Sequence, residues 1–133
     1  MKKKILLLNP NKWGRGITTI WVASHSSVLK RSGFDVKLFD ATFYENWSDF
    51  EIKINTENKQ FKKTDYLKKI KFNKSDIQED FKKTVAKFNP DIIFWSALSS
   101  HIHGEGEYIN IEYGHDLVSC IKNYQGLRIC GGI

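Results

Sequence analysis

Short continuous apolar runs recur along the chain and predict four buried strands. The runs span residues 4–9 (KILLLN), 36–40 (VKLFD), 91–97 (DIIFWSA) and 127–130 (LRIC). Apolar runs of this length that end at polar or glycine residues are typical of strands covered on both faces. The second run also alternates polar with apolar residues, and we expect it to pair with the first through a right-handed crossover.

Between these runs, apolar residues recur at helical spacing and predict three helices. The first begins near Ile17 and ends at Gly33, a residue type that suits the left-handed position after a helix. The third spans about residues 109–124 and contains Gly114, which costs a helix interior about 1 kcal/mol relative to alanine.

The second predicted helix has signals at both ends. Ser75 and Gln78 have the spacing of a capping box, with Ser75 as the N-cap. An apolar stripe follows at residues 77, 81, 85 and 88. The pair Asn89-Pro90 should end the helix, because the residue before a proline disfavours helical backbone angles.

This order of elements predicts an α/β fold with a doubly wound parallel sheet, Rossmann-like or flavodoxin-like, in three layers. Residues 1–133 form one domain, with an insertion at about 43–74 that shows no clean period. We expect the chain to be truncated before a last strand and helix, which leaves the fourth strand as an unprotected edge.

The net charge of +6 belongs to one lysine-rich segment. Residues 53–87 contain eleven lysines and five acidic residues, a balance of +6, so the remainder is neutral. This segment lacks arginine and has scattered aromatic residues, which favours a solvated insertion over a nucleic-acid surface. We expect no nucleic-acid partner, although a basic interaction module stays open as an alternative.

The N-terminus and the cysteines indicate the compartment. The apolar run after the leading lysines is too short for a secretion signal or a membrane span. The two cysteines lack CxxC spacing. We therefore expect a cytoplasmic protein without a membrane segment or a disulfide framework.

Three predicted loops should meet at one edge of the sheet, because the carboxyl ends of parallel strands lie together there. They begin at Asn9, at Ser96 and at Gly131. Glycines permit close approach of the backbone to a ligand, and serines offer hydroxyl groups. The segment GRGITT before the first helix adds backbone amides and an arginine.

The sequence resembles the cobalamin-binding domain at the N-terminus of B12-dependent radical SAM enzymes. The resemblance covers nearly the whole chain. In that family, the first helix ends in a glycine, which Gly33 matches, and the second strand ends in an aspartate, which Asp40 matches. It rests on KILLLNP, GITTIWVASHSSVLKRSGFDVKLFD, NPDIIFWSALSS and LRICGG.

The resemblance implies where the cofactor would lie. The benzimidazole tail of cobalamin would contact the loop that begins at Ser96 and slide past the glycine pair, and the corrin ring would lie near the loop after the first strand. The cofactor-binding residues implied are Asn9, Pro10, Gly14, Arg15, Gly16, Ile17, Thr18, Ser96, Ala97, Leu98, Ser99, Gly131 and Gly132.

One departure from a related family matters for the cobalt. The loop NPNKWGRG lacks the Asp-x-His-x-x-Gly of methionine-synthase-type domains. The resemblance therefore implies base-off cobalamin without a histidine ligand from that motif, and the axial ligand controls cobalt reactivity.

The chain also lacks the CxxxCxxC motif that holds the [4Fe–4S] cluster and S-adenosylmethionine in such enzymes. We expect a binding module that catalyses nothing alone and presents the corrinoid to a C-terminal radical SAM domain.

Other interpretations stay open. The main rival is the N-terminal half of a GT-B-type sugar-nucleotide glycosyltransferase. Receiver and flavin modules are less favoured, because Asn9-Pro10 and Ser96-Ala97 stand where a receiver needs acidic residues. His101 and His103 lie near Glu105 and Glu107 and could bind a metal, but a connecting loop explains them more simply.

Overall fold

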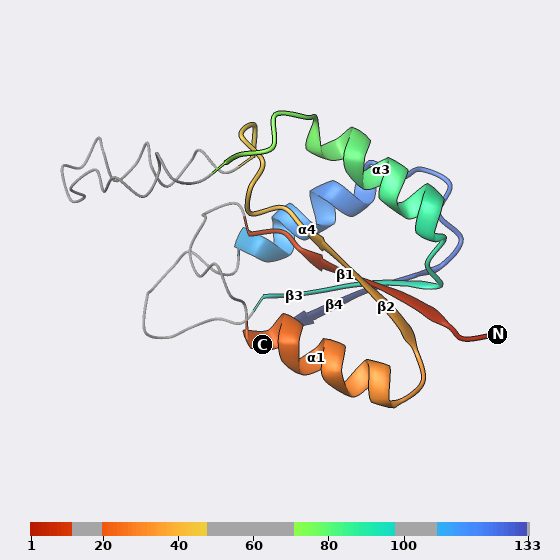
Figure 1. Ribbon diagram of the computed structural model, residues 1–133. Coiled ribbons are helices and arrows are strands. Elements are labelled where there is room, and N and C mark those ends of the chain that lie inside the picture. The colour runs from red at the N-terminus through yellow and green to blue at the C-terminus, as the bar shows by residue number, and fades with distance from the viewer. Residues whose placement is uncertain (12–19, 48–70, 98–108, 133) are drawn as a thin grey trace.

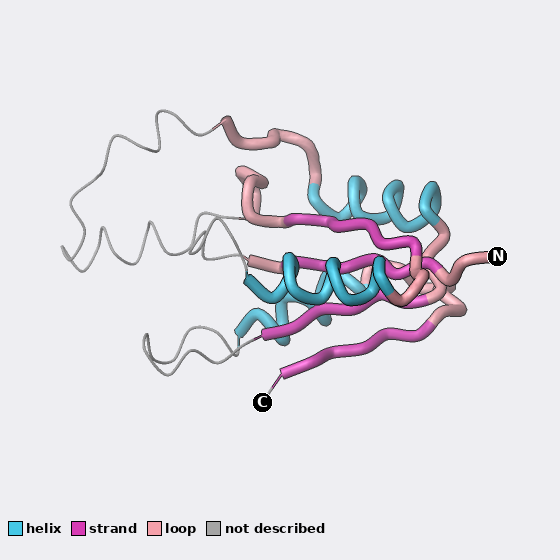
Figure 2. Tube along the Cα trace, turned by 60° about the horizontal axis from the view of Figure 1, so that its bottom comes forward, coloured by secondary structure: helices cyan, strands magenta, loops and turns pink. Residues whose placement is uncertain are grey.

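The computed structural model describes residues 1–11, 20–47, 71–97 and 109–132, and contains the four predicted strands in one sheet. The strands are β1 (Lys4–Asn9), β2 (Asp35–Asp40), β3 (Ile92–Ala97) and β4 (Leu127–Gly132). They lie in the order β2-β1-β3-β4, and every neighbouring pair is parallel. This confirms the α/β doubly wound fold; Figure 2 shows the strands side by side.

The helices cover the two faces of the sheet. Helix α1 (Ile20–Arg31) lies on one face, and α3 (Ile77–Phe88) and α4 (Ile109–Ser119) lie on the other (Figure 1). The strand order explains this arrangement. The chain moves from β1 outward to β2, then returns past β1 to β3 and β4, so right-handed crossovers in opposite directions place their helices on opposite faces.

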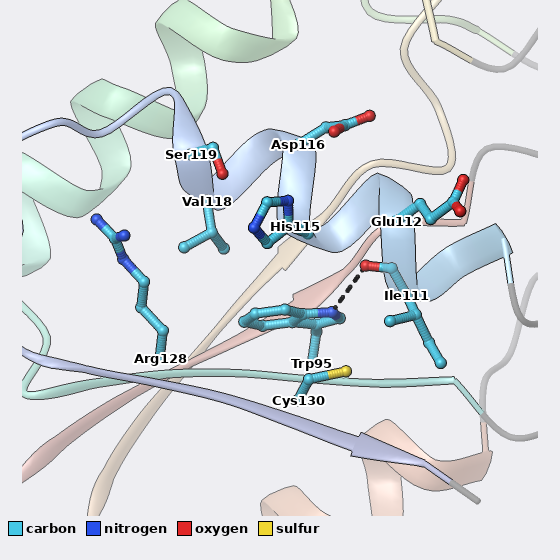
Figure 3. Close-up of a pocket in the computed structure, with 9 residues that line it drawn as sticks. All are labelled: Trp95, Ile111, Glu112, His115, Asp116, Val118, Ser119, Arg128 and Cys130. Atoms are coloured by element: carbon cyan, nitrogen blue, oxygen red, sulfur yellow. Dashed lines mark hydrogen bonds between the residues drawn. The ribbon is translucent and has the colours of Figure 1, made fainter.

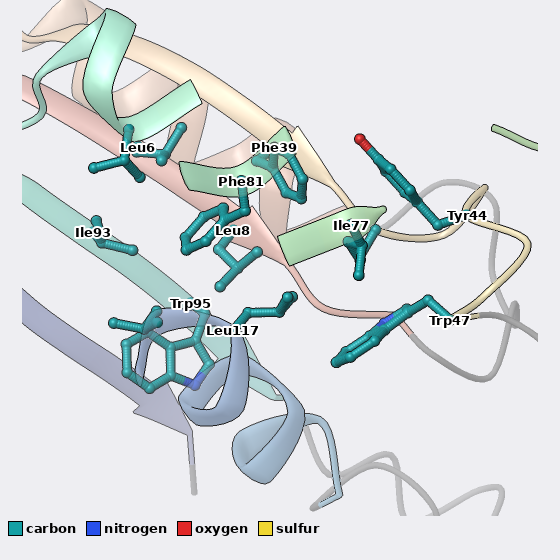
Figure 4. Packing of buried hydrophobic residues seen from close by; sticks show 13 residues of the cluster. Leu6, Leu8, Phe39, Tyr44, Trp47, Ile77, Phe81, Ile93, Trp95 and Leu117 are labelled. Atoms are coloured by element: carbon teal, nitrogen blue, oxygen red, sulfur yellow. The ribbon is translucent and has the colours of Figure 1, made fainter. Parts of the chain in front are cut away.

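The larger part of the core lies between the sheet and helices α3 and α4. Leu6 and Leu8 of β1 contribute side chains with no exposed surface, and Phe81 of α3 packs edge-on against Phe39 with ring centroids 5.0 Å apart. This core cluster, most of which Figure 4 labels, comprises Leu6, Leu8, Phe39, Ala41, Tyr44, Trp47, Ile77, Phe81, Val85, Ile93, Trp95, Leu117 and Val118.

The second part of the core lies under α1. Ile5 and Leu7, which alternate with Leu6 and Leu8 along β1, pack with Trp21 of the helix. His25, one turn further along α1, stacks on Phe94 of β3 with ring centroids 5.3 Å apart. The continuous apolar run of β1 is thus explained by burial on both faces.

Helices α1 and α3 both end where the sequence predicted, and both ends have left-handed backbone, which was predicted for Gly33 and not for Asn89. Gly33 has φ 89°, and the backbone N–H of Phe34 donates to the carbonyl of Leu29. Asn89 ends α3 with φ 49° and donates its N–H to the carbonyl of Val85. The sequence placed both ends correctly.

Other predicted boundaries are corrected. The N-cap of α3 is Asp76, whose side chain accepts a hydrogen bond from the N–H of Glu79, and not Ser75. Helix α4 ends at Ser119, earlier than predicted. Strand β4 continues through Gly131 and Gly132, because both residues pair with β3.

The two ends of the predicted insertion meet. Tyr44 and Asn73 form an isolated parallel bridge, and the backbone N–H of Asn73 donates to the carbonyl of Phe43 at 2.7 Å. The segment between them thus leaves and returns at one place beside the end of β2. In the described part of the chain, no helix is long and apolar enough to span a membrane.

Candidate functional site

The candidate site lies at the carboxyl edge of the sheet, where β1 and β3 are neighbours. Leu8 of β1 is paired with Trp95 of β3. The chain leaves β1 towards α1 on one face and leaves β3 towards α4 on the other. Strands whose connections diverge in this way form the switch point at which doubly wound sheets bind ligands.

Polar or glycine residues occupy the last α1-facing position that the structure describes on each of the four strands. Asp40, Asn9, Ser96 and Gly131 stand at these positions, and we call them the polar row. Asn9 pairs with Asp40, and Ser96 pairs with Gly131. One pleat earlier, the same face is apolar, so the polar row marks where the apolar face of the sheet ends.

Asn9 is the most buried side chain of the polar row that the structure describes. It is 5% exposed, although its amide is polar. The Nδ2 group donates to Oδ1 of Asp40 at 3.0 Å and to Oγ1 of Thr42 at 3.4 Å. Burial of a polar amide is costly unless it is hydrogen-bonded, and these two acceptors meet that requirement.

Asp40 collects several donors on one oxygen. Its Oδ1 accepts from the backbone N–H of Thr42 at 3.0 Å and from the Thr42 hydroxyl at 2.6 Å, in addition to Asn9. No residue that the structure describes donates to Oδ2 of Asp40. The carboxylate is therefore held through Oδ1, and Oδ2 has no hydrogen-bond donor among the described residues.

Trp47, which follows β2 at the start of the insertion, supports the first residues beyond β1. Its indole Nε1 donates to the carbonyl of Pro10 at 3.0 Å, and Pro10 is fully buried. The Trp47 ring also packs edge-on against Tyr113 of α4, with centroids 5.6 Å apart. The position of Pro10 therefore depends on contacts from two other parts of the chain.

Gly131 has a packing reason that the sequence did not reveal. A Cβ atom at this position would lie 3.1 Å from Cζ of Phe94 and 3.8 Å from Oγ of Ser96. The ring edge of Phe94 thus uses part of the space that the missing side chain leaves. Gly132 is paired with Ala97 in the same ladder.

The structure therefore brings together Asn9, Ser96 and Gly131 from the expected site and places Pro10, Ala97 and Gly132 beside them. Sequence reasoning missed Thr42 and Trp47, although both follow the second strand closely, and gave Asp40 no site role. Several expected residues lie outside the described part of the chain, namely Gly14, Arg15, Gly16, Ile17, Thr18, Leu98, Ser99, His101, His103, Glu105 and Glu107.

A groove of about 570 Å³ lies on the opposite face of the sheet from the polar row, between α4 and β4 (Figure 3). Trp95 forms its floor and donates from Nε1 to the carbonyl of Ile111 at 3.2 Å. Arg128 donates to the carbonyl of Ile121 at 2.8 Å, and burial raises the pKa of the Cys130 thiol. Within the described residues, no group of three His, Cys, Asp or Glu side chains is placed to hold a metal ion.

Comparison of the chain with protein-family models, with curated proteins and with solved structures finds no match. The case for a function therefore rests on the geometry of the carboxyl edge and on the resemblance in the sequence.

Proposed function

We propose that this chain binds a ligand at the carboxyl edge of the sheet and that the ligand is cobalamin in its base-off form. The observation that carries the proposal is the switch point between β1 and β3, beside which Asn9, Ser96 and Gly131 lie in the last two residues of their strands. The choice of cobalamin comes from the resemblance of the sequence to the cobalamin-binding domains of B12-dependent radical SAM enzymes.

The chemistry of the polar row fits such a ligand. The corrin ring of cobalamin carries carboxamide side chains, and its nucleotide tail carries ribose hydroxyls. Both groups donate hydrogen bonds, and the carboxylate of Asp40 has an oxygen to which no described residue donates. The small residues Ser96 and Gly131 leave the neighbouring positions without bulky side chains, which suits a close approach of a large cofactor.

The two histidines that the structure describes, His25 and His115, lie outside the polar row. The Nδ1–H of His25 donates to the carbonyl of Trp21 at 2.8 Å, and the ring stacks on Phe94, so His25 is engaged within the α1 face. His115 lines the groove beside α4 on the opposite face. Neither imidazole stands in the polar row, where it could serve as the lower ligand.

The role of this chain would be to bind and orient the cofactor. Asp40, oriented by Asn9, would fix the polar periphery of the ligand, and Ser96 and Gly131 would leave room for it. Bound cobalamin supplies methyl-transfer chemistry, and the cluster and S-adenosylmethionine of such enzymes would belong to a separate C-terminal radical SAM domain.

Retention of hydroxocobalamin tests the proposed function. The purified chain is mixed with hydroxocobalamin and desalted, and the visible spectrum of the protein fraction is recorded. We expect retained corrinoid in the wild type and its loss in Ser96→Trp, which adds bulk in the polar row. Ser119→Trp, an exposed serine on the other face, is the matched control and should retain the corrinoid.

Two results would contradict the proposal. One is a folded wild-type chain that retains no corrinoid, and the other is equal loss in Ser96→Trp and Ser119→Trp. A sugar nucleotide such as UDP-glucose is tested in the same way, because its retention would favour the glycosyltransferase alternative.

A further inference from the structure

We propose that Asp40 is a recognition residue, whose Oδ2 atom accepts a hydrogen bond from a hydroxyl or carboxamide N–H of the bound ligand. This inference rests on the proposed function, because it names the residue that would form a hydrogen bond with the polar groups at the edge of the bound corrinoid. It follows from how the carboxylate is held at the end of β2.

The orientation of the carboxylate is fixed by donors on two neighbouring segments. Asn9 approaches from the adjacent strand β1, and Thr42 approaches from the turn after β2 with both its N–H and its hydroxyl. All three bonds reach Oδ1. A side chain held through one oxygen cannot rotate without breaking these bonds, so the position of the second oxygen is defined as well.

The second oxygen is available to a ligand. An ionised carboxylate has about four lone-pair sites on its two oxygens, and the three bonds occupy only Oδ1. The described residues give Oδ2 no donor, and Asp40 is only partly buried. Because Asn9 and Thr42 are buried beneath it, Asp40 is the member of this group that a ligand reaches first.

The charge of Asp40 selects the class of group that it binds. A carboxylate accepts hydrogen bonds and repels phosphate, so the partner is a donor without negative charge. In a corrinoid, such donors occur as carboxamides on the ring and as ribose hydroxyls in the nucleotide tail. Both groups offer an N–H or O–H donor. They can be told apart with a corrinoid that lacks the nucleotide tail, because it keeps the ring carboxamides and loses the ribose hydroxyls.

Asp40→Asn changes this acceptor while it keeps the shape of the side chain. The amide oxygen of asparagine still accepts from Asn9 and Thr42, and its NH₂ group replaces Oδ2 and faces the donor of the ligand with another donor. Asp35→Asn is the matched control, because Asp35 is an exposed aspartate at the opposite end of the same strand.

The experiment measures the dissociation constants of hydroxocobalamin and of dicyanocobinamide, which lacks the nucleotide tail, by equilibrium dialysis with visible absorbance. Loss of a hydrogen bond to a charged group should raise the dissociation constant of Asp40→Asn about tenfold or more. An increase for both probes assigns the donor to a ring carboxamide, and an increase for hydroxocobalamin alone assigns it to the tail. Asp35→Asn should bind as the wild type does.

Thr42→Val keeps the carboxylate and removes one donor to Oδ1, so it tests the same inference if Asp40→Asn does not fold. Its dissociation constant should rise roughly fivefold, because the carboxylate is less firmly oriented. If Asp40→Asn folds and binds with wild-type affinity, the inference is wrong and the proposed function still stands. If Asp40→Asn does not fold, wild-type affinity of Thr42→Val has the same meaning. A folded wild-type chain that binds neither probe overturns both.

Discussion

At the scale of single residues, Gly114 shows how a tertiary contact can reverse the meaning of a sequence signal. By propensity, a glycine inside a helix is a weakness. In the structure, the backbone of α4 at Gly114 lies directly against the indole of Trp95, and a Cβ atom there would overlap the five-membered part of that ring. The same indole donates to the carbonyl of Ile111, which holds the ring in place. Gly114 is therefore required by packing.

Gly114→Ala should destabilise the protein. The gain in helix propensity is about 1 kcal/mol, but overpacking against a fixed ring costs about 1–3 kcal/mol. We expect the free energy of unfolding, measured by urea titration, to fall by about 1 kcal/mol. Asp116→Ala, an exposed change in the same helix, should have little effect. A more stable Gly114→Ala protein would show that α4 can move away from Trp95.

At the scale of elements, α3 shows that the sequence located a helix but misjudged its cap. The backbone of Asp76 has φ −71° and ψ 124°, and its Oδ1 accepts from the N–H of Glu79 at 2.9 Å. Ser75 instead donates its hydroxyl to Asn73 and to Asp80. The hydrogen bond from Ser75 lowers the pKa of Asp80, with a smaller lowering from Tyr44. The hydroxyl of Ser75 thus connects Asn73, at the end of the insertion, with Asp80 of α3 through hydrogen bonds.

Asp76→Ala should lower the free energy of unfolding by about 1 kcal/mol, because the N–H of Glu79 loses its acceptor. Asp76→Ser should retain most of the stability, since serine is also a good N-cap. Gln78→Ala tests the capping box that the sequence predicted and should change little. Urea titration of the three variants checks this, and a larger loss in Gln78→Ala than in Asp76→Ala would restore the capping box.

At the scale of the whole molecule, Asp91 joins three strands at the amino edge of the sheet. Its carboxylate accepts from the backbone N–H of Lys4 at 2.8 Å and from Nζ of Lys3 at 3.1 Å. Its carbonyl accepts from the N–H of Leu127 at the start of β4. The bond from Lys4 is the main cause that lowers the pKa of Asp91, followed by the bond from Lys3.

The depressed pKa gives Asp91 a defined effect on stability against pH. A carboxyl whose pKa is lower in the folded state stabilises the fold above its unfolded pKa of about 4, and loses this contribution as the pH falls through the folded value. Asp91→Asn should therefore lower the thermal midpoint at about pH 7, and the difference from the wild type should shrink as the pH falls below about 4. Asp35→Asn is the control. An undiminished difference at acid pH would contradict this role.

The elements of the fold were predictable because their signals are local. The four apolar runs became the four strands, and the helices end at the residues before Gly33 and at Asn89, as the sequence predicted. Once the strand order is given, the right-handedness of the crossovers fixes which face of the sheet each helix covers.

The candidate site was predictable only in part, because some of its contacts join residues that are distant in the sequence and leave no local signal. Asn9, Ser96 and Gly131 were expected at the carboxyl edge because each lies within one residue of the end of a predicted strand. Trp47 was missed because its contact partner Pro10 lies 37 residues earlier in the chain. Thr42 was missed because its contact with Asp40 depends on a turn that has no clear sequence signal. The space beside Gly131 likewise depends on the ring of Phe94.

By itself, the sequence determined which segments are strands and helices and which residues lie at the carboxyl edge of the sheet, because periodicity and strand ends are properties of neighbouring residues. Only the tertiary structure decided how the polar groups are used. It placed Asn9 beside Asp40 across two strands, oriented one carboxylate oxygen inward and left the other without a described donor. Such an arrangement depends on pairing between distant segments, which no local pattern specifies.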